Sequence, residues 1–187
     1  MSKKKVTNKN DIIELRVKRF LAMVIDWYLT NMLAVIPITF YFRNGDYLQP
    51  YMFDFTHYDF QTALLLILYG IAIGLIYYII IPVFLWKGQT LGKKICKIQI
   101  VDINENNITL KTMLLRELVG ATLLEGGIVI TATYLRKLLP VLGFTSFVEP
   151  LKYLAYGLTL LSILYAYFQP NSQSFHDKIA QTIIIKK

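Results

Sequence analysis

The stretch TALLLILYGIAIGLIYYIIIPVFLW, residues 62–86, decides the fold of this chain. It contains 25 residues and no Asp, Glu, Lys or Arg. With a rise of about 1.5 Å per residue, a helix of this length crosses the roughly 30 Å of hydrocarbon in a bilayer. Pro82 lies near its end, where a spanning helix tolerates proline, and Trp86 with Lys87 is typical of the interface. The stretch therefore predicts a membrane-spanning helix.

Three further apolar stretches flank this one, at residues 20–42, 112–132 and 151–168. The whole chain has 187 residues, is 55% hydrophobic and has a mean hydropathy of +0.47, a composition typical of membrane proteins. The third stretch contains Arg116, Glu117 and Glu125, whose acids need partners or water inside the protein. We therefore expect an all-α integral membrane protein, a four-span helical bundle.

The polar segments complete this prediction. Residues 1–19 read as a cytoplasmic amphipathic segment, residues 20–168 as the transmembrane domain and residues 169–187 as a cytoplasmic tail. Apolar and polar residues alternate from Lys97 to Asp102, and a turn follows at 104–107, which predicts a small cytoplasmic β-hairpin. Residues 182–185 suit a strand that pairs with this hairpin, giving a small sheet. For residues 133–150 we expect a loop with at most one short amphipathic turn.

The distribution of Lys and Arg predicts the orientation. Residues 1–19, 87–116 and 170–187 contain seven, six and three of the 20 basic residues, which leaves only Arg43, Arg136, Lys137 and Lys152 for the opposite side. Because cytoplasmic segments are enriched in Lys and Arg, both termini should lie in the cytoplasm of a multi-pass protein of the cell membrane. The scattered positions of these cations do not favour nucleic acid as a partner.

The segment RFLAMVID, residues 19–26, places Arg19 at the cytoplasmic mouth of the first predicted span and Asp26 two helical turns deeper. A carboxylate at that depth costs about 2.5 to 3.5 kcal/mol on insertion scales, so it should face a protein interior or a wet cavity. Asp26 is either a cation or proton site or a hydrogen-bonding link between helices. Glu125 is a second buried acid, and Glu117 lies about two turns before it.

The segment GQTLGKKICKIQIVD, residues 88–102, contains two glycines and a lysine that superficially resemble a phosphate-binding loop. The glycine spacing is one residue too short, and no Ser or Thr follows Lys93, so we do not predict a nucleotide site. Lys93, Lys94 and Lys97 either contact anionic lipid headgroups or only anchor the chain on the cytoplasmic side. We favour simple anchoring.

The segment SFHDKIAQT, residues 174–182, carries Asp177 at the cytoplasmic level. We expect an ion pair between Asp177 and Arg19 that ties the tail to the first span, with Arg116 and Glu117 near enough to join a network. Metal-ligand spacings and the motifs of nucleophilic catalysis are absent from the sequence, so we expect neither an enzyme nor a bound metal or cofactor.

These three segments together resemble the RDD family of small bacterial membrane proteins, named for an arginine and two aspartates. Arg19 and Asp26 look like the arginine and the first aspartate, residues 88–102 look like the central block, and Asp177 looks like the second aspartate. The resemblance covers most of the chain. It implies a multi-span bundle and a suspected transport role, with cation/proton antiport proposed for some members.

Two functions remain open from the sequence. In the first, the chain is a small transporter and possible homo-oligomer, in which Asp26 and Glu125 bind a proton or monovalent cation while Arg19 and Asp177 gate or orient. In the second, it is a non-catalytic adaptor or regulator of a partner membrane protein. Four spans are few for a transporter, and no inverted repeat is evident, which favours the adaptor. A cavity lined by both acids would favour transport instead.

Overall fold

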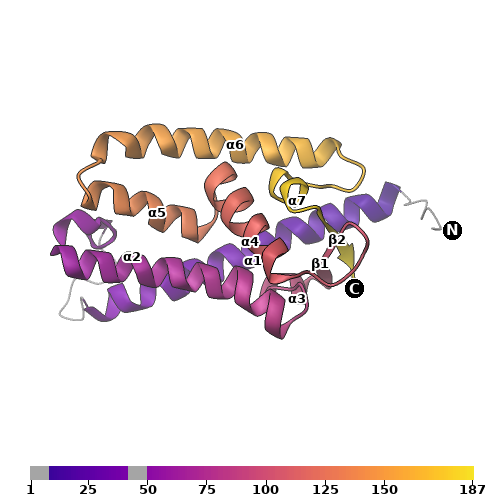
Figure 1. Ribbon diagram of the computed structural model, residues 1–187, viewed down its shortest axis with the longest axis horizontal. Coiled ribbons are helices and arrows are strands. Elements are labelled where there is room, and N and C mark those ends of the chain that lie inside the picture. The colour runs from indigo at the N-terminus through magenta and orange to yellow at the C-terminus, as the bar shows by residue number, and fades with distance from the viewer. Residues whose placement is uncertain (1–8, 42–49) are drawn as a thin grey trace.

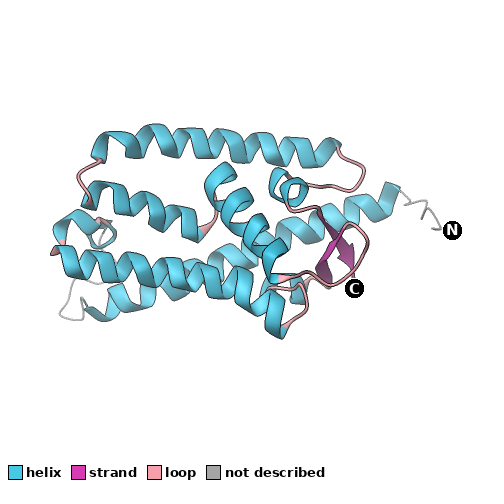
Figure 2. Cartoon of the chain, in the orientation of Figure 1, coloured by secondary structure: helices cyan, strands magenta, loops and turns pink. Residues whose placement is uncertain are grey.

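The computed structural model describes residues 9–41 and 50–187, and the fold is mostly helical (Figure 1). The long elements are α1 (Lys9–Tyr41), α2 (Phe60–Leu75) with η3 (Ile76–Leu85), and α6 (Val148–Phe168). The shorter helices are η1 (Pro50–Phe53), η2 (Phe55–His57), α3 (Leu91–Ile95), α4 (Leu110–Leu114), η4 (Leu115–Glu125), α5 (Ile130–Val141), η5 (Thr145–Phe147) and α7 (Phe175–Ile179). Strands β1 (Ile98–Asp102) and β2 (Thr182–Lys186) form a small sheet (Figure 2).

Three helical segments of the described chain are long and apolar enough to cross a membrane: Asn10–Phe40, Phe60–Leu85 and Thr145–Phe168. A fourth crossing exists only if Leu110–Glu125 and Ile130–Val141, which are bent by 52° relative to each other, form one broken span. The predicted third span at 112–132 is therefore wrong as a continuous helix. The helix ends at Gly126, which adopts a left-handed conformation (φ 63°) that glycine tolerates best.

Two other predicted boundaries differ from the structure. Residues 9–19 are not separated from the first predicted span, since both belong to the single helix α1. The predicted loop at 133–150 is wrong, because α5 and η5 occupy most of it and α6 begins at Val148. The charges of Arg136 and Lys137 hid this helix in the sequence. Lys137 is accommodated because its Nζ lies 4.6 Å from the ring centre of Phe55 and donates to the Phe53 carbonyl at 2.8 Å.

Two segments, η3 and η4, are π-helical, with hydrogen bonds between residues five apart. The last bonds run from Trp86 N to Ile81 O at 3.0 Å and from Gly126 N to Ala121 O at 2.9 Å. Proline inside η3 has no N–H to donate, and the wider turn accommodates the freed carbonyls. π-Helical turns are rare in proteins, but those that occur often lie at functional sites. The residues of η3 and η4 are therefore candidates for a functional site.

The sheet joins the middle of the chain to its end. Strand β1 pairs antiparallel with β2, with Ile100 opposite Ile184, so the predicted pairing of the C-terminal strand is present. The second arm of the predicted hairpin does not form a strand, and only one bridge, Val101 to Asn107, is made there. Asp102 instead accepts the Asn104 and Asn106 amides at 2.9 and 2.7 Å and closes a tight turn.

The apolar core is divided into two clusters. One contains Ala34, Ile38, Met52, Phe55, Ala63, Leu66, Ile67, Ile130 and Tyr134, and the other contains Ala22, Ile79, Ile98, Ile100, Ile108, Met113 and Ile184. Along α1 the buried polar residues Asp26 and Thr30 separate the two clusters. The second cluster lies at the end of the molecule that holds the sheet, where α1 begins and β2 ends (Figure 1).

Candidate functional site

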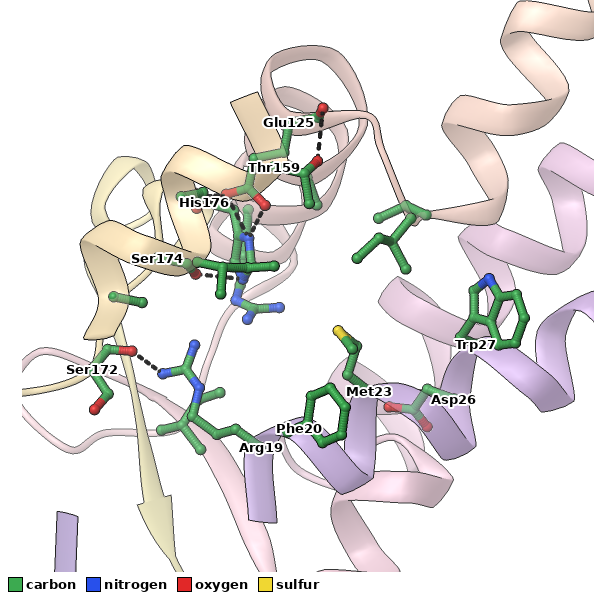
Figure 3. Close-up of a pocket in the computed structure, with 18 of the residues that line it drawn as sticks. Arg19, Phe20, Met23, Asp26, Trp27, Glu125, Thr159, Ser172, Ser174 and His176 are labelled. Atoms are coloured by element: carbon green, nitrogen blue, oxygen red, sulfur yellow. Dashed lines mark hydrogen bonds and ion pairs between the residues drawn. The ribbon is translucent and has the colours of Figure 1, made fainter. Parts of the chain in front are cut away.

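A cavity of about 360 Å³ lies between α1, η4 and α6, on the side toward α7 (Figure 3). Its wall carries Arg16, Arg19, Asp26, Lys93, Arg116, Glu117, Glu125 and His176 among aliphatic and aromatic side chains such as Phe20, Met23, Trp27 and Ile163. Charged groups from four different elements, α1, α3, η4 and α7, therefore meet around one space. This juxtaposition makes the cavity the candidate functional site.

Asp26 on α1 is 1% exposed and is held by four donors. Oδ1 accepts from the Tyr77 hydroxyl at 2.5 Å and the Gly92 amide at 2.8 Å. Oδ2 accepts from the Thr90 hydroxyl at 2.5 Å and Lys93 Nζ at 3.3 Å. Every one of these groups is a donor in its ordinary state, so the carboxylate is a satisfied link from α1 to η3 and α3.

The central sequence block lies against α1 because it has a glycine at the contact point. A Cβ atom at Gly92 would lie 2.4 Å from the Ala22 carbonyl oxygen and 2.7 Å from Asp26 Oδ1. Thr90 begins α3 as its N-cap, with its hydroxyl oxygen accepting the Lys93 amide at 3.4 Å. The block is thus an Asp26-binding turn.

Asp177 in α7 is completely buried and joins two arginines. Arg19 Nη2 lies 2.6 Å from Oδ2, while Arg116 donates to Oδ1 from Nε at 3.1 Å and from Nη2 at 2.9 Å. The Ser174 amide and hydroxyl also donate to Oδ2, at 3.1 and 2.8 Å, in a capping box. The ion pair with Arg19 predicted from the sequence is present, and α1, η4 and α7 meet at one carboxylate.

The charges around Asp177 fix its ionisation. Burial raises the pKa of the Asp177 carboxyl, but the positive charges of Arg19 and Arg116 outweigh that effect and hold the pKa well below its ordinary value. Arg116 is 4% exposed and also contacts Glu117 Oε1. The network predicted from Arg19, Arg116, Glu117 and Asp177 is therefore continuous.

Glu125, at the end of η4, has a titratable partner. Its Oε1 and Oε2 lie 2.9 and 3.0 Å from His176 Nδ1. Oε1 also accepts from the His176 amide at 3.0 Å and the Ser162 hydroxyl at 2.7 Å. Ser162 Oγ in turn accepts the Phe175 amide at 2.9 Å, which directs the serine hydrogen to Glu125. The group Glu125, Ser162 and His176 is called the Glu125 cluster below.

The hydrogen bonds of His176 require a proton between it and Glu125. Ser174 Oγ donates to ionised Asp177, so it accepts from His176 Nε2, which lies 2.8 Å away and must carry a hydrogen. His176 Nδ1 then contacts Glu125 either as N–H of an imidazolium or as the acceptor of a protonated carboxyl. In both states the pair holds one proton more than a neutral histidine beside a carboxylate.

Two close backbone contacts position this pair. A Cβ at Gly120 would lie 2.6 Å from His176 Cα, so α7 packs directly on η4. A Cβ at Gly127 would lie 2.4 Å from Thr159 Oγ1, which accepts the Gly127 amide at 3.1 Å and donates to the Glu125 carbonyl at 3.1 Å. Hydrogen bonds from α6 thus satisfy the backbone where the η4 helix breaks.

The structure brings most of the sequence candidates together. Asp26, Glu117 and Glu125 all line the cavity, as do Arg19 and Arg116. Asp26 and Glu125 do not contact each other, and each has its own partners.

The three central lysines differ in their surroundings. The Lys93 side chain is 12% exposed, and its Nζ lies 3.3 Å from Asp26 Oδ2, so its charge is directed into the protein. Lys94 lies over the Trp86 ring at 4.6 Å, and both Lys94 and Lys97 are exposed.

Sequence reasoning did not assign Tyr77, Ser162 or His176 to the site. Tyr77 lies in an apolar block, and Ser162 is a lone hydroxyl in a predicted span. His176 beside Asp177 was the one available signal, but no pattern linked it to Glu125, which is 51 positions away. In residues 9–41 and 50–187, no three His, Cys, Asp or Glu side chains converge in a way that could hold a metal ion.

Comparison with known proteins gives the family. The RDD family model matches residues 15–181, which is most of the chain, and the chain belongs to that family. The resemblance seen in the sequence is confirmed. Neither the curated proteins nor the solved structures include a match to this chain.

Proposed function

We propose that this chain is a small membrane protein that exchanges a monovalent cation for a proton across the bilayer, and that Glu125 with His176 carries the proton. The observation that supports this function is the hydrogen-bond pattern of the pair, which holds one proton at the wall of the cavity. Imidazole is the side chain whose ordinary pKa lies nearest to physiological pH. A cation that replaces this proton would meet the Glu125 carboxylate.

In this proposal Glu125 binds the exchanged proton or cation, and Asp26 has a structural role. Asp26 is surrounded by four donors that fill both oxygens, so a cation could bind there only by displacing Lys93 or a hydroxyl. Glu125 needs to lose only the proton that it shares with His176. Arg19, Arg116 and Asp177 then hold α7 in place and keep His176 against Glu125.

We also propose that the terminal segments of the chain lie in the cytoplasm. The charge count favours a cytoplasmic location for residues 1–19 and 170–187, and α1 begins at the same end of the molecule as β2 ends (Figure 1). The cavity then lies toward the cytoplasmic half of a protein of the cell membrane. A proton held at Glu125 would be accessible from that side first.

The experiment measures proton movement in proteoliposomes. An imposed Na⁺ or K⁺ gradient should move protons in vesicles that contain the natural protein, reported by an internal pH-sensitive dye. Glu125→Gln and His176→Gln should abolish this signal, since neither variant can keep the shared proton. Glu149→Gln is the matched control, because Glu149 is an exposed acid of α6 whose ion-pair partner among the described residues is Lys152.

Two results would reject the proposal. One is the absence of cation-driven proton movement in the natural protein reconstituted in a folded state. The other is unchanged movement in Glu125→Gln and His176→Gln.

A second candidate function, a non-catalytic adaptor, is favoured by the exposure of α6. This helix packs on η4 and α5, and its other faces leave large apolar side chains uncovered, including Leu160, Leu161, Leu164 and Phe168. Lipid can cover such a surface, and so can a helix of a second copy or of a partner protein. Crosslinking through cysteines placed at Leu161 and Leu164, in the natural membrane, would capture that helix. Labelling by lipid-soluble reagents alone would reject the adaptor.

A further inference from the structure

We infer that the mouth of the cavity, between α1 and α6, binds one anionic phospholipid, with its phosphate at Arg16 and an acyl chain along Phe20 and Ile163. This ligand is different from the proton and cation of the proposed exchange. The inference depends on Arg16 and on the membrane location of the chain, and it does not require Glu125 or His176 to move a proton.

Among the described residues, Arg16 is the cation of the cavity without an acidic partner. In the part of the chain that the structure describes, no carboxylate lies within 4 Å of its guanidinium, whereas Arg19 and Arg116 share Asp177 and Lys93 contacts Asp26. Arg16 donates to the Ser172 hydroxyl at 3.0 Å and the Tyr167 carbonyl at 2.5 Å. Its Nη1 has no acceptor among the described residues, so a phosphate can bind there without breaking an existing bond.

The position of the guanidinium is fixed in advance. Its carbon lies 4.6 Å from the ring centre of Tyr167, on which the planar group stacks. The hydrogen bonds from Nε and Nη2 of Arg16 to Ser172 and Tyr167 hold one edge of the guanidinium group. A lipid phosphate would therefore meet an arginine that is already ordered, which favours binding over simple attraction to a mobile surface charge.

The cavity is open sideways at this position. Phe20 of α1 and Ile163 and Tyr167 of α6 line it, yet they are 61%, 50% and 60% exposed, so their outer faces lie at the surface of the protein. In a membrane that surface meets acyl chains. The close-up shows Phe20 and Met23 projecting from α1 toward the open space, with Trp27 farther along the helix (Figure 3).

The polarity of the mouth matches the polarity of a phospholipid. Arg16 precedes Phe20 by about one turn and Trp27 by about three turns, so the cation lies nearest the chain ends and the apolar side chains lie deeper in the span. On α6 the order is the same, with Tyr167 near the chain ends and Ile163 deeper. A headgroup at the interface and a chain directed to the bilayer centre fit this order.

Trp27 allows the site to be tested directly, because it lines the cavity and the chain has only one other tryptophan, Trp86. The experiment uses Trp86→Phe protein in nanodiscs that contain phosphatidylglycerol or phosphatidylcholine with brominated acyl chains. Bromine quenches a nearby indole, so the ratio of quenching at equal mole fractions reports the preference for the anionic lipid.

We expect phosphatidylglycerol to quench Trp27 more strongly than phosphatidylcholine in the Trp86→Phe background. Arg16→Gln should lower this preference about fivefold, the effect of one lost cation near an anionic lipid. Arg16→Lys should retain most of it. Lys18→Gln is the matched control, since Lys18 is on the same helix but pairs with Glu14 at 2.8 Å and does not line the cavity.

A second variant tests the acyl-chain part without a change of charge. Ala166 of α6 also lines the cavity, between Ile163 and Tyr167 in the sequence. Ala166→Phe adds a ring there and should abolish the preference even if Arg16→Gln proves difficult to fold. Glu125→Gln should keep it, which separates this inference from the exchange function. Equal losses in Arg16→Gln and Lys18→Gln, no preference in the starting protein, or a preference retained in Ala166→Phe would overturn the proposal.

Discussion

Asp26 and Glu125 are both buried carboxylates on the wall of one cavity, but their partners are of different kinds. Asp26 accepts from two hydroxyls, a backbone amide and a lysine, which are donors in every state near neutral pH. Glu125 faces His176, and histidine is the residue type whose ordinary pKa lies nearest to neutral pH. A buried acid is therefore judged by whether its partners can change, because both carboxylates are buried on the wall of the same cavity.

Asp177 is the clearest example of a buried acid whose partners do not change their protonation. Its loss should have the largest effect on stability. Asp177→Asn leaves Arg19 and Arg116 without their common counter-charge, and removing one partner of a buried ion pair costs about 3 to 5 kcal/mol. We expect little folded protein after detergent extraction, measured by size-exclusion chromatography and thermal unfolding. Full folding of this variant would contradict the role of Asp177 as the junction of α1, η4 and α7.

Acid should weaken the same junction without a mutation. Because the two arginines hold the pKa of Asp177 well below its ordinary value, its ionised form contributes stability that is fully present above its unfolded pKa of about 3.9. That contribution is lost as the pH falls from there toward the folded pKa.

Thermal unfolding followed from about pH 6 to about pH 3 should therefore show a steep loss below about pH 4. Any folded Asp177→Asn protein should lose less thermal stability over the same pH range. Parallel curves for the two proteins would contradict this assignment.

The direct comparison of the two cavity acids uses their amide variants. In Asp26→Asn, Lys93 loses its counter-charge, and one hydroxyl donor faces the NH₂ group of the new side chain. These losses should lower the free energy of unfolding by about 1 to 3 kcal/mol. Glu125→Gln can still accept from Ser162 and donate to neutral His176, so its stability should change by less than about 1 kcal/mol.

Thermal unfolding in detergent measures both variants, and only Glu125→Gln should abolish proton movement per folded molecule. The reverse order of stabilities would remove the distinction between a structural acid and an exchangeable one.

The sequence predicted the parts of this fold that depend on local patterns. Apolar length identified three helices that are long enough to cross a membrane, and alternation identified the strand at residues 98–102. A shared level at the cytoplasmic side suggested the pairing of Arg19 with Asp177. These signals are local or follow from placing two charges at one membrane level. They reached the correct residues for the ion-pair network.

The remainder depends on contacts that no local pattern encodes. Asp26 meets Tyr77 and Gly92 only because α1 packs on both η3 and α3, and Glu125 meets His176 because Gly120 lets α7 approach η4. The helix break at Gly126 was hidden because apolar residues continue on both sides of it. A hydropathy pattern measures the polarity of a segment and is insensitive to its direction.

Lys186 gives the smallest expected effect and tests whether burial or the number of ion pairs decides stability. It contacts Asp11 at 3.0 Å and also Glu14, so it links β2 to the start of α1, but all three side chains are at least one third exposed. Exposed ion pairs gain little in water, since solvent screens them and holding long side chains loses entropy. Lys186→Gln should leave the apparent melting temperature unchanged within experimental error, although it removes as many carboxylate contacts as Asp177→Asn removes arginine contacts. A clear destabilisation would mean that the sheet is held to α1 mainly by charge, and the contrast between buried and exposed acids would then fail.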